Sequence, residues 1–99
     1  MTVTSTRAND VITISIDGRV DTNTSPQLQQ EILTSFQKVN NVILDFKKCE
    51  YISSAGLRAL LIGQKTAASK RGSMKLINLT DVVREVLAVT KFDSILSIE

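Results

Sequence analysis

The chain has 99 residues, of which 42% are hydrophobic, 4% aromatic and 22% charged, with a formal net charge of +2. This length predicts a single domain, residues 1–99, whose core is built from aliphatic side chains. The chain has one cysteine, which excludes an internal disulfide, and no histidine. Together these two facts exclude the usual zinc sites and the Ser-His or Cys-His pairs of common hydrolases.

The charge and the hydropathy pattern also bear on partners and location. The small net charge argues against nucleic-acid binding, and no apolar run approaches the ~20 residues that cross a bilayer. We therefore expect a cytoplasmic protein that is not an enzyme, binds no nucleic acid and does not insert directly into a membrane.

The first third of the chain predicts a hairpin and a helix. Residues 3–7 and 11–16 are strand candidates, joined by a tight turn at Asn9 and Asp10, because apolar and polar residues nearly alternate in the second segment. Residues 24–26, Thr-Ser-Pro, begin a helix with hydroxyl caps and a proline in the first turn. The apolar face of this helix consists of Leu28, Ile32, Leu33 and Phe36.

Strands then alternate with helices to the end of the chain. The predicted elements are a buried strand at 42–46, a helix from about 54 to 70, a strand at 74–77, a helix from Thr80 to Val89 and a strand at 95–98. This alternation predicts an α/β fold with a mixed, mostly parallel sheet of four to five strands, an N-terminal hairpin and about three covering helices.

Two adjacent hydroxyl residues, Ser53 and Ser54, stand where the loop after the central strand gives way to a helix. A serine at this position can cap the helix through its side-chain oxygen. A phosphate on the same serine would face free backbone N–H groups and the positive end of the helix dipole. The residues alone leave both interpretations open.

Two aspartates and an arginine have similar pairs of interpretations. Asp21 either bonds the backbone of its own loop or meets Ser54, because loops at the carboxyl ends of neighbouring strands lie together. Asp45, at the expected end of its strand, either bonds nearby backbone or supports the same site. Arg58 lies one helical turn after Ser54 and is either a solvated cation or a partner for an anion there.

Two motifs occur in order along the chain. The first is Ile16-Asp17-Gly18-Arg19-Val20-Asp21 followed by Thr24-Ser25-Pro26, and the second is Ile43-Leu44-Asp45-Phe46 followed by Ser53-Ser54-Ala55-Gly56-Leu57. Together they resemble the STAS family, most closely the bacterial anti-sigma-factor antagonists, over nearly the whole chain. The resemblance implies that Ser54 is a phosphoacceptor and that Asp21 is its carboxylate neighbour.

The resemblance also implies a partner surface around Ser54. Its residues in this sequence would be Asp21, Thr22, Asn23, Ser53, Ala55, Gly56, Leu57 and Arg58, with Asp45 in a supporting position. In such a protein the unphosphorylated form binds an anti-sigma factor that is also a serine kinase, and thereby releases the sigma factor. Phosphorylation switches binding off, and a separate phosphatase restores it.

Cofactors and assembly follow from the same resemblance. ATP and magnesium would be bound by the partner kinase only, so we expect no cofactor, metal or catalytic residue in this chain, which would be a monomer or a weak dimer. An alternative stays open, because Ser53 stands where many relatives have an acidic residue: a constitutive STAS interaction subunit of a transporter or a larger signalling assembly.

Overall fold

The chain begins with a β-hairpin, which sets the register of the sheet. In the computed structural model, which describes all 99 residues, β1 (Thr2–Ala8) pairs antiparallel with β2 (Val11–Val20), from Ala8 opposite Val11 to Thr2 opposite Asp17. Asn9 adopts a φ of 56°, the left-handed conformation that a two-residue hairpin turn requires at its first position. The predicted hairpin and its turn are confirmed.

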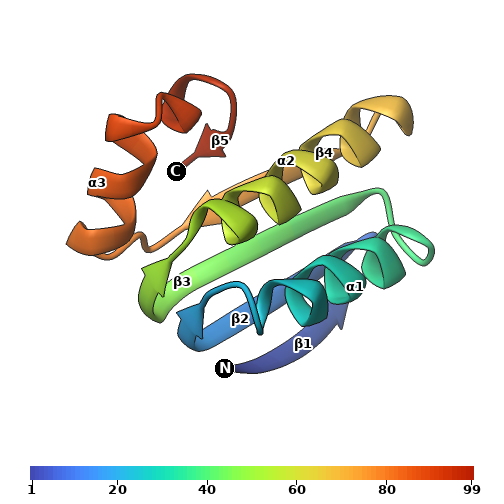
Figure 1. The fold of residues 1–99 in the computed structure, drawn as a ribbon. Helices are drawn as coiled ribbons and strands as arrows, with labels where there is room; N and C mark the ends of the chain where they lie inside the picture. Colours follow the sequence, from blue (N-terminus) through green and yellow to red (C-terminus); the bar gives the residue numbers. More distant parts are fainter.

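The remaining strands extend the sheet in parallel. They are β3 (Asn41–Ile52), β4 (Ser73–Ile77) and β5 (Ser97–Ile98), and the order across the sheet is β1-β2-β3-β4-β5 (Figure 1). Only the β1–β2 pair is antiparallel. The structure thus confirms a mixed, mostly parallel sheet with an N-terminal hairpin.

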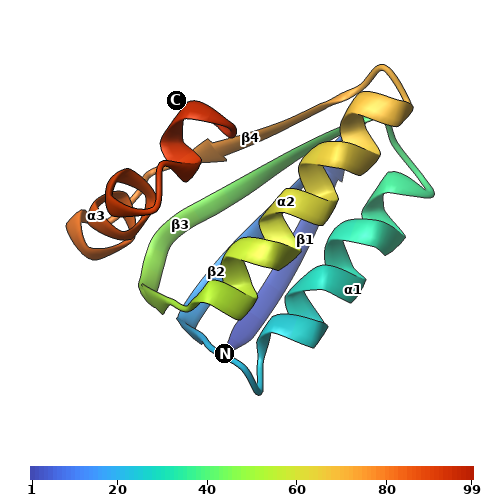
Figure 2. The same ribbon diagram turned by 45° about the horizontal axis from the view of Figure 1, so that its top comes forward.

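Three α-helices connect the strands. Two of them, α1 (Ser25–Phe36) and α2 (Ser54–Ser69), lie next to each other on one face of the sheet, while α3 (Asp81–Val89) lies apart from them beside β3 (Figure 2). The hydroxyls of Ser53 and Thr80 cap α2 and α3 by accepting hydrogen bonds from Gly56 N and Val83 N. None of the three α-helices combines the length and the hydrophobicity that a membrane span requires.

The core is largely aliphatic, as the composition predicts, and Phe36 and Phe46 are its aromatic members. The side chains of β2, β3 and β4 that face the helices are fully buried, among them Ile14, Leu44 and Leu76. Leu28, Ile32 and Phe36 of α1 are buried against them, whereas Leu33, expected on the same face, is only half-buried. These apolar contacts fix α1 and α2 over the sheet, and so fix the loops that precede both helices.

Three strands differ from the expected bounds by more than one residue at an end. β2 continues past Ile16 to Val20, and β3 continues past Phe46 to Ile52, because register shifts between the two strands absorb the break in alternation at Lys47 and Lys48. Both lysines are exposed in succession, which from the sequence resembles a loop. β5 has only two residues, because a 3-10 turn occupies Phe92–Ser94.

Candidate functional site

The two serines before α2 have separate positions. Ser53 is half-buried at the N-cap with extended backbone, and its Oγ accepts a hydrogen bond from Gly56 N at 3.3 Å. Ser54 is the first residue of the helix, is exposed, and its hydroxyl has no hydrogen-bond partner. The capping role therefore belongs to Ser53, and the hydroxyl of Ser54 remains accessible.

The loop between β2 and α1 is folded around Asp21. Its Oδ1 accepts hydrogen bonds from Asn23 N at 2.9 Å and from Thr24 N at 3.0 Å. The bond from Thr24 N is the main reason why the pKa of Asp21 lies below its ordinary value, and the bond from Asn23 N adds to this effect. The Thr24 hydroxyl donates to Arg19 O at 2.8 Å and accepts from Asp21 N, so it closes the loop and does not cap α1 as its sequence position suggests.

The sheet brings this loop next to the two serines. Val20 and Ile52 are register partners at the carboxyl ends of β2 and β3, and Ser53 N donates to Val20 O at 2.8 Å. The residues that follow, Asp21 in one loop and Ser54 in the other, therefore leave adjacent strand ends. This is the edge at which open α/β sheets place their sites.

A groove of about 500 Å³ runs between α1 and α2 from this edge. It is lined by Thr22, Ser25, Pro26, Gln29, Gln30, Ala55, Arg58 and Ile62. Three of these residues, Thr22, Ala55 and Arg58, belong to the predicted partner surface. Asn23, next to Thr22 in the same loop, is exposed beside the groove. Arg58 is exposed and makes no ion pair, since the only one in the chain joins Lys75 to Glu99.

Sequence reasoning missed five of the eight residues that line this groove. Gln29 and Gln30 come from α1, and Ile62 comes from α2 with 37% of its surface exposed. The exposure of Ile62 could have been suspected from its position four residues after Arg58, whereas polar glutamines on a helix carry no distinguishing signal. Arg19 was also missed: its guanidinium stacks on the Tyr51 ring at 4.6 Å and helps to lower the pKa of Asp21.

Gly56 and Leu57 lie beneath this surface, which corrects their expected place on it. Leu57 is 3% exposed and belongs to the core. A Cβ on Gly56 would lie 2.6 Å from Ile52 Cγ1 and 2.8 Å from Val20 Cγ1, so the helix start sits directly on the two strand ends. The two residues support the exposed surface, because α2 could not reach the strands so closely without them.

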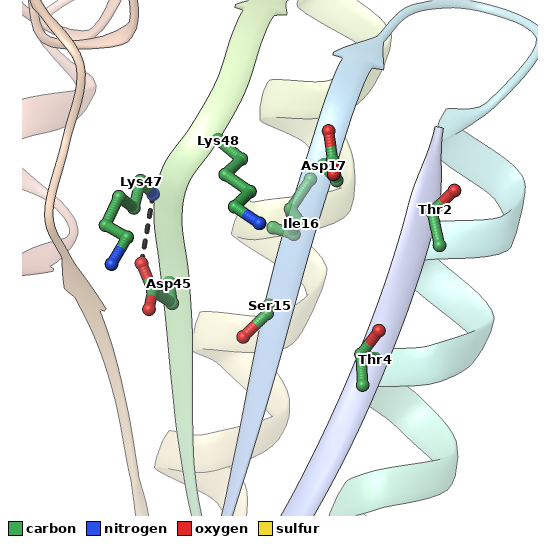
Figure 3. Close-up of a pocket in the computed structure, with 8 residues that line it drawn as sticks. All are labelled: Thr2, Thr4, Ser15, Ile16, Asp17, Asp45, Lys47 and Lys48. Atoms are coloured by element: carbon green, nitrogen blue, oxygen red, sulfur yellow. Dashed lines mark hydrogen bonds between the residues drawn. The ribbon is translucent and has the colours of Figure 1, made fainter.

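Asp45 lies elsewhere, because β3 does not end at Phe46. It is in the middle of the strand, roughly 20 Å along it from Ile52 at the usual rise per residue, on the face that α1 and α2 do not cover. There its Oδ1 accepts from Lys47 N at 2.9 Å and from Asn78 Nδ2 at 3.2 Å, at a shallow hollow of about 280 Å³ (Figure 3). The structure does not bring Asp45 to Ser54.

The single cysteine takes no part in the site. Cys49 is 1% exposed within β3, and burial raises the pKa of its thiol. No group of histidine, cysteine and acidic side chains has an arrangement that could hold a metal ion. The chemistry that the site offers is an exposed hydroxyl at a helix N-terminus, next to a groove and an ordered carboxylate loop.

Comparisons with known proteins agree with this fold. The family model of the STAS domain matches residues 2–99. "Putative anti-sigma factor antagonist BtrV" of Bordetella bronchiseptica is 32% identical over 96 residues, covering 96% of this chain and 83% of that protein. The anti-sigma factor antagonist SpoIIAA in its unphosphorylated form superposes with a TM-score of 0.84 at 20% identity, covering 99% of this chain and 88% of that one.

The phosphorylated form of the Bacillus cell fate determinant SpoIIAA superposes with a TM-score of 0.77 at 19% identity, covering 99% of this chain and 91% of that one. Anti-sigma factor antagonists of this kind are regulatory proteins and not enzymes, in agreement with the expectation from composition. The motifs, the fold and the match over residues 2–99 lead to one conclusion: the chain belongs to the STAS domain family.

Proposed function

We propose that this protein is a cytoplasmic anti-sigma factor antagonist controlled by phosphorylation of Ser54. In its unphosphorylated form it binds an anti-sigma factor that is also a serine kinase, and so frees the sigma factor. Phosphorylation of Ser54 by that kinase, with ATP and magnesium, weakens the complex, and a phosphatase restores it.

The observation that carries the proposal is the difference between the two serines: Ser53 caps α2, and the hydroxyl of Ser54 is exposed and unbonded. A kinase needs a hydroxyl that is exposed and free of internal bonds, and Ser54 meets both conditions while Ser53 is engaged as the cap. A phosphate on Ser54 would also be stabilised by the helix dipole, by about 0.3–1 kcal/mol. Phosphorylation can therefore proceed without disturbing the cap that holds α2 in place.

The groove between α1 and α2 supports a docking role next to the switch. It begins at the exposed loop residue Thr22 and at Ala55, directly after Ser54, and continues to the exposed Ile62. A partner seated there would meet Ser54 at its rim. A phosphate adds about −1.5 to −2 charges at that point, and a surface fitted to a neutral serine would then have to desolvate an anion.

Asp21 would act in the kinase reaction by ordering the loop that flanks Ser54. Its carboxylate holds the backbone of Asn23 and Thr24 in one conformation, so the kinase meets a preformed loop. A loop that is already ordered loses less entropy on binding.

The test is incubation of the purified protein with the kinase-type anti-sigma factor encoded nearest to its gene, with ATP and magnesium, followed by intact mass measurement and peptide mapping. We expect one phosphoryl group, on Ser54. Ser54→Ala should abolish the modification, and the matched control Ser53→Ala should retain it. A phosphate on Ser53, or no modification at all, would contradict the proposal, and the second outcome would favour a constitutive interaction subunit.

A further inference from the structure

The two edges of the sheet differ in a way that the site around Ser54 does not explain. β5 forms one edge with only two residues, which is a common way to blunt a sheet edge. β1 forms the other edge (Figure 1). It has seven residues, Thr2–Ala8, all exposed except the half-buried Val3. This edge has no strand beyond it and is long enough to pair with another strand.

β1 also lacks the features that keep an edge strand from pairing. It contains no proline, lysine or acidic residue, and its only charge is Arg7. Its register with β2 runs from Thr2 to Ala8 without a bulge. Ser5 and Arg7 tether it on the helix side, by hydrogen bonds from the Ser5 hydroxyl to the Glu31 carboxylate and from the Arg7 guanidinium to Lys38 O.

The hairpin determines which backbone groups of β1 are free. In a two-residue hairpin the residues that flank the turn, here Ala8 and Val11, form a hydrogen-bonded pair. Hydrogen-bonded and non-hydrogen-bonded pairs then alternate along the strands. Even-numbered residues of β1 therefore bond to β2, and the N–H and C=O groups of Val3, Ser5 and Arg7 point outward.

We propose that a second copy of this chain pairs with that edge, β1 against β1, antiparallel about a two-fold axis at Ser5. In this register Ser5 lies opposite Ser5 of the other copy, and Val3 lies opposite Arg7 on both sides of the axis. These are the residues with free backbone groups, so three hydrogen-bonded pairs supply about six main-chain hydrogen bonds. The interface is self-complementary, as a two-fold dimer requires.

The side chains on both faces are compatible with this register. Thr4 lies opposite Thr6 in the closely spaced pairs, and threonine pairs across strands are favourable. The two arginines lie at opposite ends and face valine. One repulsion remains: each Ser5 hydroxyl binds a Glu31 carboxylate, so both carboxylates lie on the helix side of the axis. A short interface with such a repulsion gives a weak dimer.

The test uses sedimentation velocity of the full chain from micromolar to millimolar concentration. We expect the mass to rise from 10.9 kDa toward twice that value. Ser5→Pro should abolish the rise, because it removes an outward N–H that β2 does not use, and proline is tolerated at such edge positions. Glu31→Gln should lower the dissociation constant several-fold by removing the repulsion, and Ser15→Ala, outside the pairing edge, should leave it unchanged.

Amide hydrogen exchange gives a second measurement that does not depend on any variant. As concentration rises, exchange should slow at Val3, Ser5 and Arg7 and stay constant at Thr4 and Thr6. A chain that is monomeric at every concentration, or a dimer that Ser5→Pro leaves intact, would overturn the proposal. The proposal would also be overturned if exchange at the outward amides slowed only when an extended segment of another protein was added, and not when the concentration of this chain rose. Ser54 lies outside this edge, so failure here leaves the phosphorylation test unaffected.

Discussion

Ser53 and Ser54 are neighbours in sequence, but only Ser53 contributes to the stability of α2. We expect Ser53→Ala to lower the free energy of unfolding by ~1 kcal/mol, because Gly56 N loses its acceptor. Ser54→Ala, at an exposed position without a hydrogen bond, should change it by less than about half that amount. Urea denaturation of both variants measures the difference, and equal effects would show that the cap is shared.

Asp21 should contribute stability that depends on pH. Its pKa is lowered in the folded protein, so the contribution is complete above the unfolded pKa of about 3.9 and disappears as pH falls through the lower, folded value. Asp21→Asn keeps an oxygen acceptor for Asn23 N and Thr24 N but removes the charge. We therefore expect the wild type to have a larger free energy of unfolding than the variant at neutral pH. The difference between the two free energies should become smaller below about pH 4.

The same variant separates folding from kinase recognition. In Asp21→Asn the side-chain oxygen still accepts from Asn23 N and Thr24 N, but it lacks the charge that strengthens both hydrogen bonds. The loop is therefore held less firmly, so the melting temperature at neutral pH should fall only slightly, while phosphorylation by the partner kinase should slow. Melting curves across pH and the initial rate of phosphate incorporation measure the two effects. A normal rate in this variant would remove the carboxylate from the proposed reaction.

At the scale of elements, the contact between the start of α2 and the ends of β2 and β3 holds the site in place. Gly56→Ala should lower the free energy of unfolding by about 1–3 kcal/mol, because its Cβ would crowd Ile52 and Val20. Helix propensity favours alanine by about 1 kcal/mol, but these contacts are too short for that gain to prevail. The exposed Ser54→Ala, two residues earlier, is the matched control, and a stabilised Gly56→Ala would contradict this view of the helix start.

The order of elements could be predicted from local chemistry. Asn9 and Asp10 indicate the hairpin turn, and Ser53 and Thr80 mark helix starts where the structure has them. The extent of β3 could not be predicted, since a bulge places Lys47 and Lys48 in succession on exposed positions and hides the continuation of the strand. That misreading placed Asp45 at a strand end.

Some residues of the candidate site could be predicted from sequence and others could not, because only some of them belong to a local pattern. Ser54 and Asp21 belong to short motifs at strand ends, so the sequence brings them together through the topology. Gln30 and Ile62 line the groove only because α1 and α2 pack side by side, and no local pattern records that contact. Gly56 and Leu57 belong to the same motif as Ser54, and the structure shows that both are buried and support the partner surface from beneath.

At the scale of the whole molecule, phosphorylation should act without refolding the domain. The formal net charge falls from +2 to about zero, but the new charge lies at an exposed helix N-terminus with Arg58 one turn away. We expect unchanged circular dichroism and an equal or slightly higher melting temperature for the phosphorylated protein. A melting temperature lower by several degrees would indicate a conformational switch instead.

The affinity of the partner anti-sigma factor for the two forms tests the central claim most directly. Isothermal titration calorimetry, with that protein titrated into the unphosphorylated chain and into the chain phosphorylated at Ser54, measures the two dissociation constants under the same conditions. We expect strong binding of the first form and of Ser54→Ala, and much weaker binding of the phosphorylated form and of Ser54→Asp. Equal affinity for the phosphorylated and unphosphorylated chains would contradict a switch at Ser54.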